Sequence, residues 1–184
     1  MAHEYSTYTT IFKNISIMFY HRKCYDESQI ETISQELLTN LDESLETSTE
    51  YFILKIIHDK IKKKDVIEEF VSRPSNCPKL LLISSIFPKV SSFLSTVDVE
   101  VFTIQEMILN PMAHKYSPKK VTVLSKDECK KFLDDMQISF FSLPQIKISD
   151  PLARYYKLKL DNIIEIERNS LACGTSLYYR RVVN

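Results

Sequence analysis

The chain opens with apolar residues that recur every three or four positions, which is the spacing of one face of a helix. The stripe consists of Tyr8, Ile11, Phe12, Ile15, Met18 and Phe19. We interpret it as a helix packed on its own core rather than as a surface for a partner. A second helix is predicted over residues 28–41, because Ser28 with Glu31 forms a capping-box signature ahead of apolar residues at helical spacing.

The next hundred residues alternate between short apolar runs and short helical patterns. Apolar or aromatic runs at 51–57, 80–83 and 99–103 predict buried strands. Between them, 65–71 and 88–94 carry the spacing of short helices. Strands that alternate with helices indicate a small α/β sheet.

The last third of the chain follows a different pattern. Ser125 and Glu128 form a capping-box signature for a helix that carries apolar residues as far as Met136. Strands are predicted over 163–167 and 176–183, with Gly174 between them at a position that favours a positive φ. A helix followed by antiparallel strands, after an α/β half, gives an α+β chain.

Composition excludes several classes of enzyme. The chain holds one glycine, which rules out the glycine-rich dinucleotide fingerprint, the phosphate-binding loop and the nucleophile elbow of hydrolases. Its four cysteines and four histidines are scattered without the paired spacing of a zinc site. We therefore expect no metal and no cofactor, and reduced thiols.

The net charge of zero conceals two halves of opposite sign. Residues 1–112 carry 11 basic and 16 acidic side chains, a net charge of −5, and residues 113–184 carry 13 and 8, a net charge of +5. Because Asn110-Pro111-Met112 breaks regular structure between them, we expect two domains, 1–112 and 113–184. No apolar run is long enough to span a bilayer and the first ten residues are polar, so we expect no membrane partner and a cytoplasmic or nuclear location.

A long and specific motif lies in the second half. Residues 143–155 read Leu-Pro-Gln-Ile-Lys-Ile-Ser-Asp-Pro-Leu-Ala-Arg-Tyr, followed by Arg-Asn-Ser at 168–170, Ala-Cys-Gly at 172–174 and Tyr-Arg at 179–180. Upstream, 114–118 read His-Lys-Tyr-Ser-Pro. Over about 107–183 the chain resembles the fifth subunit shared by the eukaryotic nuclear RNA polymerases, a family that also includes its archaeal counterpart.

The departures from the family pattern indicate a diverged member. Lys120 stands where the family usually has a histidine, Asn169 replaces a proline, and Leu171 replaces an acidic residue. Lys157 and Asp161 occupy positions that are usually glycine. Asp161 and the asparagine after it can still form the turn, because both residue types tolerate left-handed backbone geometry.

The resemblance implies a non-catalytic subunit of DNA-directed RNA polymerase. It implies that 1–112 is a jaw domain that reaches toward downstream DNA, and that 113–184 is an assembly domain that docks on the largest subunit. The implied location is the nucleus, or a viral particle or factory. The implied interface residues are His114, Pro118, Asp150, Pro151, Arg154, Tyr155, Arg168, Ser170, Gly174, Tyr179 and Arg180, and the implied DNA-proximal residues are Ser85, Pro88 and Lys89.

Local chemistry supports part of this assignment independently. Asp150-Pro151 is a turn opener, because Asp bonds backbone amides just ahead of it and Pro presets φ. Arg154 then falls on a short helical turn. The arginines of this half are forked donors suited to carboxylates of another chain, although each would serve equally well in a surface ion pair worth about 0–1 kcal/mol.

Two other functions remain open at this stage. A small α/β sheet with scattered acids is compatible with a metal-dependent nuclease, but the strand that offers Lys55 has isoleucine at position 53 where an acidic residue is needed. The other alternative is an adaptor that uses the assembly fold outside polymerase.

Overall fold

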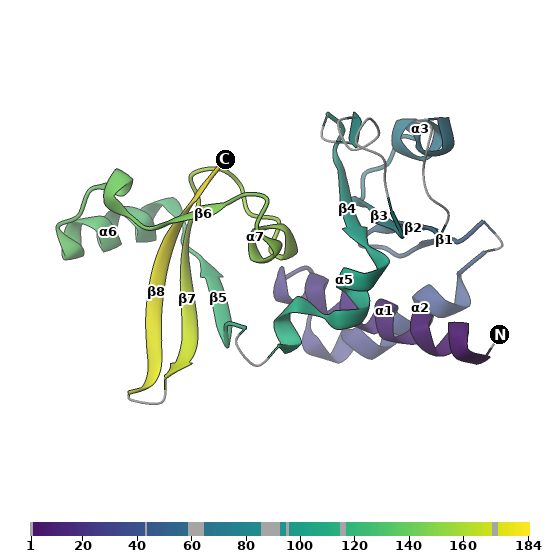
Figure 1. The fold of residues 1–184 in the computed structure, drawn as a ribbon, viewed down its shortest axis with the longest axis horizontal. Helices are drawn as coiled ribbons and strands as arrows, with labels where there is room; N and C mark the ends of the chain where they lie inside the picture. The colour runs from purple at the N-terminus through teal and green to yellow at the C-terminus, as the bar shows by residue number, and fades with distance from the viewer. Residues whose placement is uncertain are drawn as a thin grey trace. The chain divides into compact units, whose positions relative to one another are not determined.

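The structure is a computed structural model of the 184-residue chain, and it describes residues 2–42, 44–58, 65–85, 93–94, 96–114, 117–170 and 173–184. The chain divides into two compact units (Figure 1), an N-terminal unit of residues 1–110 and a C-terminal unit of residues 111–184. The described residues of each unit form one four-stranded sheet together with helices. The chain is therefore α+β, as the sequence predicts. None of the described helices is long and apolar enough to cross a bilayer.

The first predicted helix is present as α1, Ala2–His21. The apolar stripe forms its buried face: Ile11, Phe12, Ile15, Met18 and Phe19 are all at most 2 % exposed. The second helix, α2 (Ile30–Thr39), packs against α1 and buries Ile33 and Leu37. Phe19 also stacks on Phe52, with 4.2 Å between the ring centroids, and so joins α1 to the sheet.

The predicted capping box of the second helix is wrong. The helix is preceded by a 3₁₀ turn, η1 (Glu27–Gln29), and the backbone N–H of Asp26 donates to the Gln29 side chain over 3.1 Å. The capping residues are therefore Asp26 and Gln29, two positions before the predicted Ser28 and Glu31. The extra turn shifts the start of the helix, and Asp is as good a cap as Ser, so spacing alone does not separate the two.

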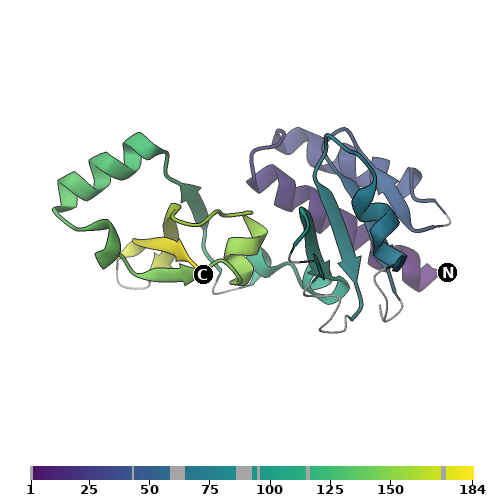
Figure 2. The same cartoon turned by 90° about the horizontal axis from the view of Figure 1, so that it is seen from above.

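The N-terminal sheet has the strand order β1-β2-β3-β4. The predicted strands are β2 (Ile53–Ile57), β3 (Lys79–Ile83) and β4 (Val99–Thr103), which are parallel to one another. Strand β1 (Glu46–Ser48) pairs with β2 in the antiparallel sense and was not predicted, because three residues carry no usable alternation. The predicted helix between β2 and β3 is α3, Asp65–Ser72. Figure 2 shows α3 lying over the strands, where Ile67 packs with Leu81 and Ile83.

Two further segments belong to this unit. The short helix α5 (Ile104–Leu109) follows β4 directly, and Thr103 caps it by accepting from the N–H of Glu106 over 3.1 Å. This helix was not predicted. The helix predicted over 88–94 lies outside the described residues except for its last two, of which Leu94 is buried in the same cluster as Ile67.

The C-terminal sheet has the strand order β5-β7-β8-β6. Its centre is the hairpin of β7 (Ile163–Ser170) and β8 (Gly174–Val183), the two predicted strands, which pair over eight positions. Strand β5 (Lys120–Val123) joins β7 in the antiparallel sense, whereas β6 (Gln145–Lys147) joins β8 in parallel. The expectation of purely antiparallel strands is therefore wrong for β6, a short strand whose partner is more than thirty residues away.

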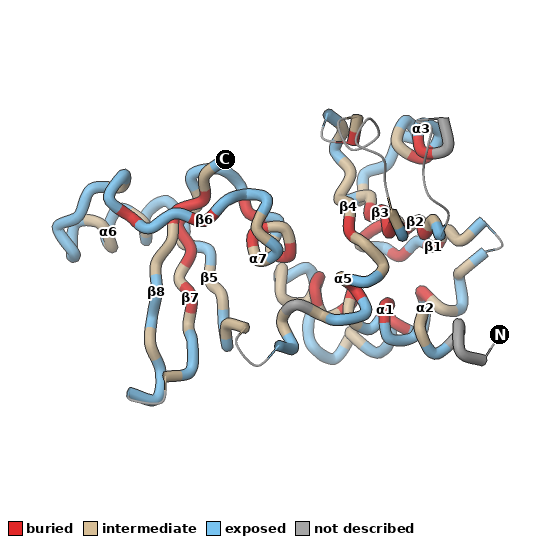
Figure 3. Tube along the Cα trace, viewed as in Figure 1, coloured by how far each residue is buried: buried red, intermediate tan, exposed pale blue. Residues whose placement is uncertain are grey.

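The remaining elements cover this sheet. The predicted helix is α6 (Lys126–Met136), capped by Ser125 and Glu128 as expected, and α7 (Pro151–Tyr155) is a helix of five residues. The described part of the unit also contains two 3₁₀ turns, η2 (Pro111–Ala113) and η3 (Phe140–Ser142). Ala153 of α7 packs on Ile164, Ile166 and Val182, which share one face of the sheet. In contrast, α6 has no buried residue (Figure 3).

Among the described residues near or within the hairpin, three have left-handed backbone geometry. Gly174 has a φ of 72°, as its position in the sequence suggests, and the two residues that stand at usual glycine positions, Lys157 and Asp161, have φ values of 48° and 63°. A side chain at such a φ costs about 1–2 kcal/mol, because its Cβ approaches the following carbonyl. At Lys157 and Asp161 the chain therefore keeps a backbone conformation that favours glycine, although neither residue is glycine.

This strain leads to a prediction for Lys157→Gly. Relief of the left-handed strain should outweigh the added freedom of the unfolded chain and raise the free energy of unfolding by about 0.5–1 kcal/mol. The measurement is the urea midpoint of the full chain. Lys159→Gly is the matched control, because Lys159 is exposed in the same loop without a positive φ, and this change should lower the midpoint. A fall in both variants would contradict the prediction.

Candidate interface of the C-terminal unit

The Asp150-Pro151 segment forms the turn that its sequence suggests. The Asp150 carboxylate accepts from the backbone N–H of Leu152 over 2.9 Å, and Pro151 occupies the first turn of α7. The backbone N–H of Arg154 donates to the Asp150 carbonyl over 3.0 Å, which closes the helical turn. Arg154 is thereby held, half-buried, in the last turn of this helix.

Tyr155 is buried, with 1 % of its surface exposed, and its ring meets that of Tyr156 edge to face. A partner could not contact a ring in this position without a rearrangement. Of the two neighbouring interface residues implied by the resemblance, Arg154 is therefore the one within reach of a partner.

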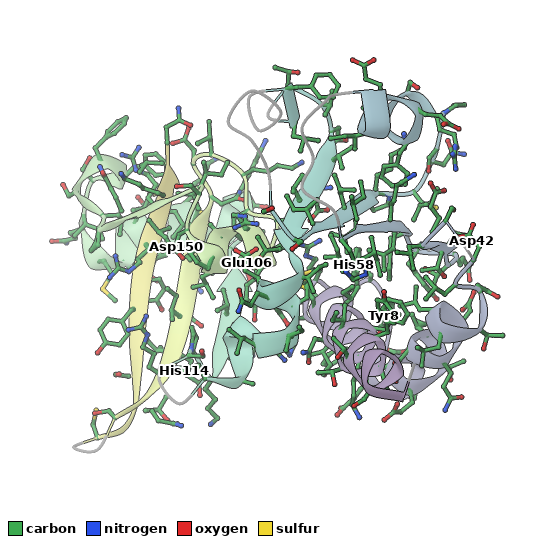
Figure 4. The ribbon with its side chains drawn as sticks, turned by 45° about the vertical axis from the view of Figure 1, so that its right-hand side comes forward. Tyr8, Asp42, His58, Glu106, His114 and Asp150 are labelled. Atoms are coloured by element: carbon green, nitrogen blue, oxygen red, sulfur yellow. The ribbon has the colours of Figure 1, made fainter. Side chains whose placement is uncertain are left out.

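A second group of the predicted interface residues lies toward the turn of the hairpin. The backbone N–H of Lys119, next to Pro118, donates to the Glu167 carbonyl over 2.8 Å, and Ser170 pairs with Gly174. Figure 4 places His114 and Asp150 far apart in the C-terminal unit. Ten of the eleven predicted residues thus form two groups and not one patch: His114, Pro118, Arg168, Ser170 and Gly174 in one, and Asp150, Pro151, Arg154, Tyr155 and Arg180 in the other. The eleventh, Tyr179, contacts Glu165 and Phe132.

Tyr179 and Arg180 make contacts inside the unit. The Tyr179 hydroxyl donates to Glu165 Oε2 over 2.6 Å, and its ring stacks on Phe132 with 4.0 Å between centroids. The hydrogen bond to the carboxylate, aided by burial and by the charge of Glu165, raises the pKa of Tyr179 to about 12. Arg180 Nη1 donates to the Gln145 carbonyl over 2.9 Å. These contacts join α6 and β6 to the hairpin.

The residues expected near DNA are only partly described. Ser85 is half-buried two residues after the end of β3, whereas Pro88 and Lys89 lie outside the described residues. In the same unit, Glu46 bridges Lys55 at 2.5 Å and Arg73 at 2.9 Å. Burial alone would raise the pKa of Glu46, but the hydrogen bonds from these two cations lower it below its usual value. This network joins β1, β2 and the segment after α3.

Sequence reasoning identified Arg181 only as one of the forked donors of this half and missed the aromatic group around it. Arg181 is 9 % exposed, and its guanidinium lies 4.9 Å from the ring centroid of Phe140 and 5.0 Å from that of Phe141. The signal in the sequence is weak, because the two aromatic residues precede Arg181 by about forty positions. In the part of the chain that the structure describes, no three His, Cys, Asp or Glu side chains are grouped as a metal site would require.

Comparison with known proteins gives this arrangement a family. The sequence profile of the RNA polymerase Rpb5 C-terminal domain matches residues 109–182. A 38 % identical stretch of 82 residues covers 97 % of DNA-directed RNA polymerase subunit Rpo5 of Archaeoglobus fulgidus and 45 % of this chain. The chain belongs to the RNA polymerase Rpb5 family. The match to the profile extends over nearly the whole C-terminal unit, from the residues before η2 to the end of β8.

Longer relatives match with lower coverage. DNA-directed RNA polymerase subunit 5 of Acanthamoeba polyphaga mimivirus is 27 % identical over 135 residues, which is 72 % of this chain and 65 % of that protein. The subunit 5-like protein 1 of Arabidopsis thaliana is 37 % identical over 90 residues, 49 % of this chain and 41 % of that protein. The chain thus spans less than two thirds of these Rpb5 relatives. The mimivirus match extends beyond the length of the C-terminal unit.

The raised pKa of Tyr179 leads to a prediction at alkaline pH. An unfolded tyrosine titrates near pH 10, so the stabilisation by the neutral Tyr179 is complete below pH 10 and is lost as pH rises toward 12. Tyr179→Phe should lower the free energy of unfolding by about 1 kcal/mol at neutral pH. The substitution should also make the free energy of unfolding fall less steeply as pH rises from 10 to 12.

The test is the urea midpoint measured from pH 7 to pH 12. Tyr178→Phe is the control, because Tyr178 is exposed and its ring, which the change keeps, meets Arg168 at 5.6 Å. The interpretation of Tyr179 is wrong if both variants lose stability with pH as steeply as the wild type.

Proposed function

We propose that this chain is a non-catalytic subunit of a DNA-directed RNA polymerase. The observation that carries the proposal is the match over 109–182 to the Rpb5 C-terminal domain. The archaeal relative supports the proposal. It is named a polymerase subunit, and 97 % of its length corresponds to a stretch that is 45 % of this chain. The family relatives in a virus and in a plant carry the same kind of name.

The C-terminal unit is the part that we assign to assembly, by docking on the largest polymerase subunit. Its net charge is +5, from 13 basic and 8 acidic side chains, so it favours an acidic surface. Charge complementarity of this kind speeds encounter and fixes register more than it sets affinity. The half-buried Arg154, held by the Asp150-Pro151 turn, is the side chain that we place at the centre of this contact.

The N-terminal unit is the part that we assign to the jaw, reaching toward downstream DNA within the complex. Its net charge of −5 does not favour binding to a polyanion by itself. DNA contact would depend on placement by the other subunits, through the segment of Ser85, Pro88 and Lys89. The proposed location is the nucleus, or a viral factory if the source is a virus.

Arg154→Ala tests the assembly role. The variant should fold normally and be retained at least about 30-fold less tightly by the largest polymerase subunit, equivalent to about 2 kcal/mol for the loss of a central arginine. The measurement is affinity purification of the tagged full chain from its source cell, with partners identified by mass spectrometry. Circular dichroism and melting of the purified variant check its folding.

Lys159→Ala provides the control, since Lys159 is an exposed cation on the same unit. If Arg154→Ala destabilises the chain, Arg154 is a structural residue. If the largest polymerase subunit retains Arg154→Ala as tightly as it retains Lys159→Ala, the docking face is assigned wrongly. Recovery of the wild type with other proteins and without any polymerase subunit would favour the adaptor function.

Binding of DNA by the isolated chain should be weak. Because phosphate contacts release counterions, any residual binding should fall steeply as salt rises. Fluorescence anisotropy with a labelled 30-base-pair duplex at 50 and 150 mM salt measures it. Sub-micromolar affinity at 150 mM salt would show that the chain binds nucleic acid on its own.

A further inference from the structure

Exposed apolar side chains are concentrated in the C-terminal unit. Among the described residues, eight of the ten large hydrophobic side chains that are exposed belong to this unit. Three of the eight lie within six positions, from the end of α6 through the connecting residues to η3: Met136 is 57 % exposed, Ile138 38 % and Phe141 74 %. Several exposed apolar side chains within one short segment of a small module are typical of an interaction site.

The same segment lies against a buried cation. Arg181 is nine-tenths buried, and its guanidinium contacts the rings of Phe140 and Phe141. Its ion pair joins Nη1 to Asp161 Oδ1 at 3.4 Å, which is long, and the Asp161 side chain is 69 % exposed. Arg181 Nε is buried and has no hydrogen-bond partner among the described residues. We call Arg181, Phe140, Phe141 and Asp161 the Arg181 clamp.

This arrangement is costly for the chain on its own. On the strand, Arg181 is paired with Ile163, which is fully buried, so an aliphatic side chain would suit the position. A buried cation needs a well-made partner, and one long contact to a solvated carboxylate repays little of its lost hydration. The guanidinium is a fork that can grip a carboxylate through Nε and Nη together, and in the clamp that pairing is not made.

We propose that the Arg181 clamp binds a carboxylate from an acidic segment of another polypeptide, whose apolar side chains cover Met136, Ile138 and Phe141. Phe141, being largely exposed, is the ring that moves aside to open Nε. The net charge of +5 on the unit favours an acidic occupant. The exposed apolar side chains beside the clamp disfavour a nucleic acid backbone, which carries a charge on every phosphate.

The inference rests on the proposed function in one respect: it takes the acidic segment to belong to a polymerase subunit. It is distinct from the role proposed for Arg154, since the clamp consists of η3, β8 and the turn before β7. Of its residues, the sequence points only to Arg181, as one of the arginines suited to a carboxylate of another chain.

Arg181→Met separates docking from folding, because the two roles predict opposite signs. In the isolated chain, methionine removes the buried charge and keeps the apolar volume, so the melting temperature should rise by roughly 2–4 °C. In affinity purification from the source cell, retention of polymerase subunits should fall at least tenfold. Lys130→Met is the matched control, because it removes one charge from an exposed position on α6, and both measurements should stay at the wild-type value.

A photo-crosslinking amino acid at position 141 of the tagged full chain identifies the occupant. In the assembled complex it should react with a peptide of net negative charge from a polymerase subunit, and the crosslink should be lost when Arg181→Met is also present.

Four outcomes would overturn the inference. A lower melting temperature for Arg181→Met would make Arg181 a structural residue, and unchanged retention would remove it from the interface. A crosslink to nucleic acid would assign the surface to a different ligand. If the wild-type chain recovers no polymerase subunit, both the proposed function and this inference fail. If the wild type and Arg181→Met recover polymerase subunits equally well, only the inference about the clamp fails.

Discussion

The eight-position antiparallel pairing of β7 with β8 is the interaction on which the C-terminal unit depends. It sorts the residues of both strands onto two faces with different chemistry. One face carries Ile164, Ile166 and Val182, which α7 covers. The other carries Glu165, Tyr179 and Arg181, whose contacts are polar and aromatic. A slip of one residue would exchange the two sets and place charges in the aliphatic core, so the hydrophobic pattern enforces the register.

Arginine serves three different purposes on this hairpin. Arg180 donates to the backbone carbonyl of Gln145 and so fastens β6, and Arg168 lies over the exposed ring of Tyr178. Arg181 lies against the rings of Phe140 and Phe141 on the other face of the sheet. The positive charge of the unit is therefore not spread evenly over its surface, because each of these three arginines is oriented by a different neighbour. This is why net charge alone predicts the sign of a partner but not the surface that it contacts.

The features that could be read from the sequence are those with a strong local cause. The stripe on α1, the box of Ser125 with Glu128, the Asp150 turn and the positive φ of Gly174 each depend on residues a few positions apart. Strands β1, β5 and β6 were missed, because segments of three or four residues become strands only through pairing with partners elsewhere in the chain. The Arg181 clamp was missed for the same reason, since the rings that flank Arg181 come from η3, about forty residues earlier.

The strand order of the C-terminal sheet has a consequence for synthesis on the ribosome. Strand β8 lies between β7 and β6, yet it is made after both of them. Until synthesis has passed Val183 and β8 has left the exit tunnel, β6 has no neighbour and β7 has only β5. The N-terminal sheet is complete once β4 has emerged, some eighty residues earlier. The two units therefore reach their native sheets at different times, and the later one passes through a stage with an open strand edge that a chaperone can cover.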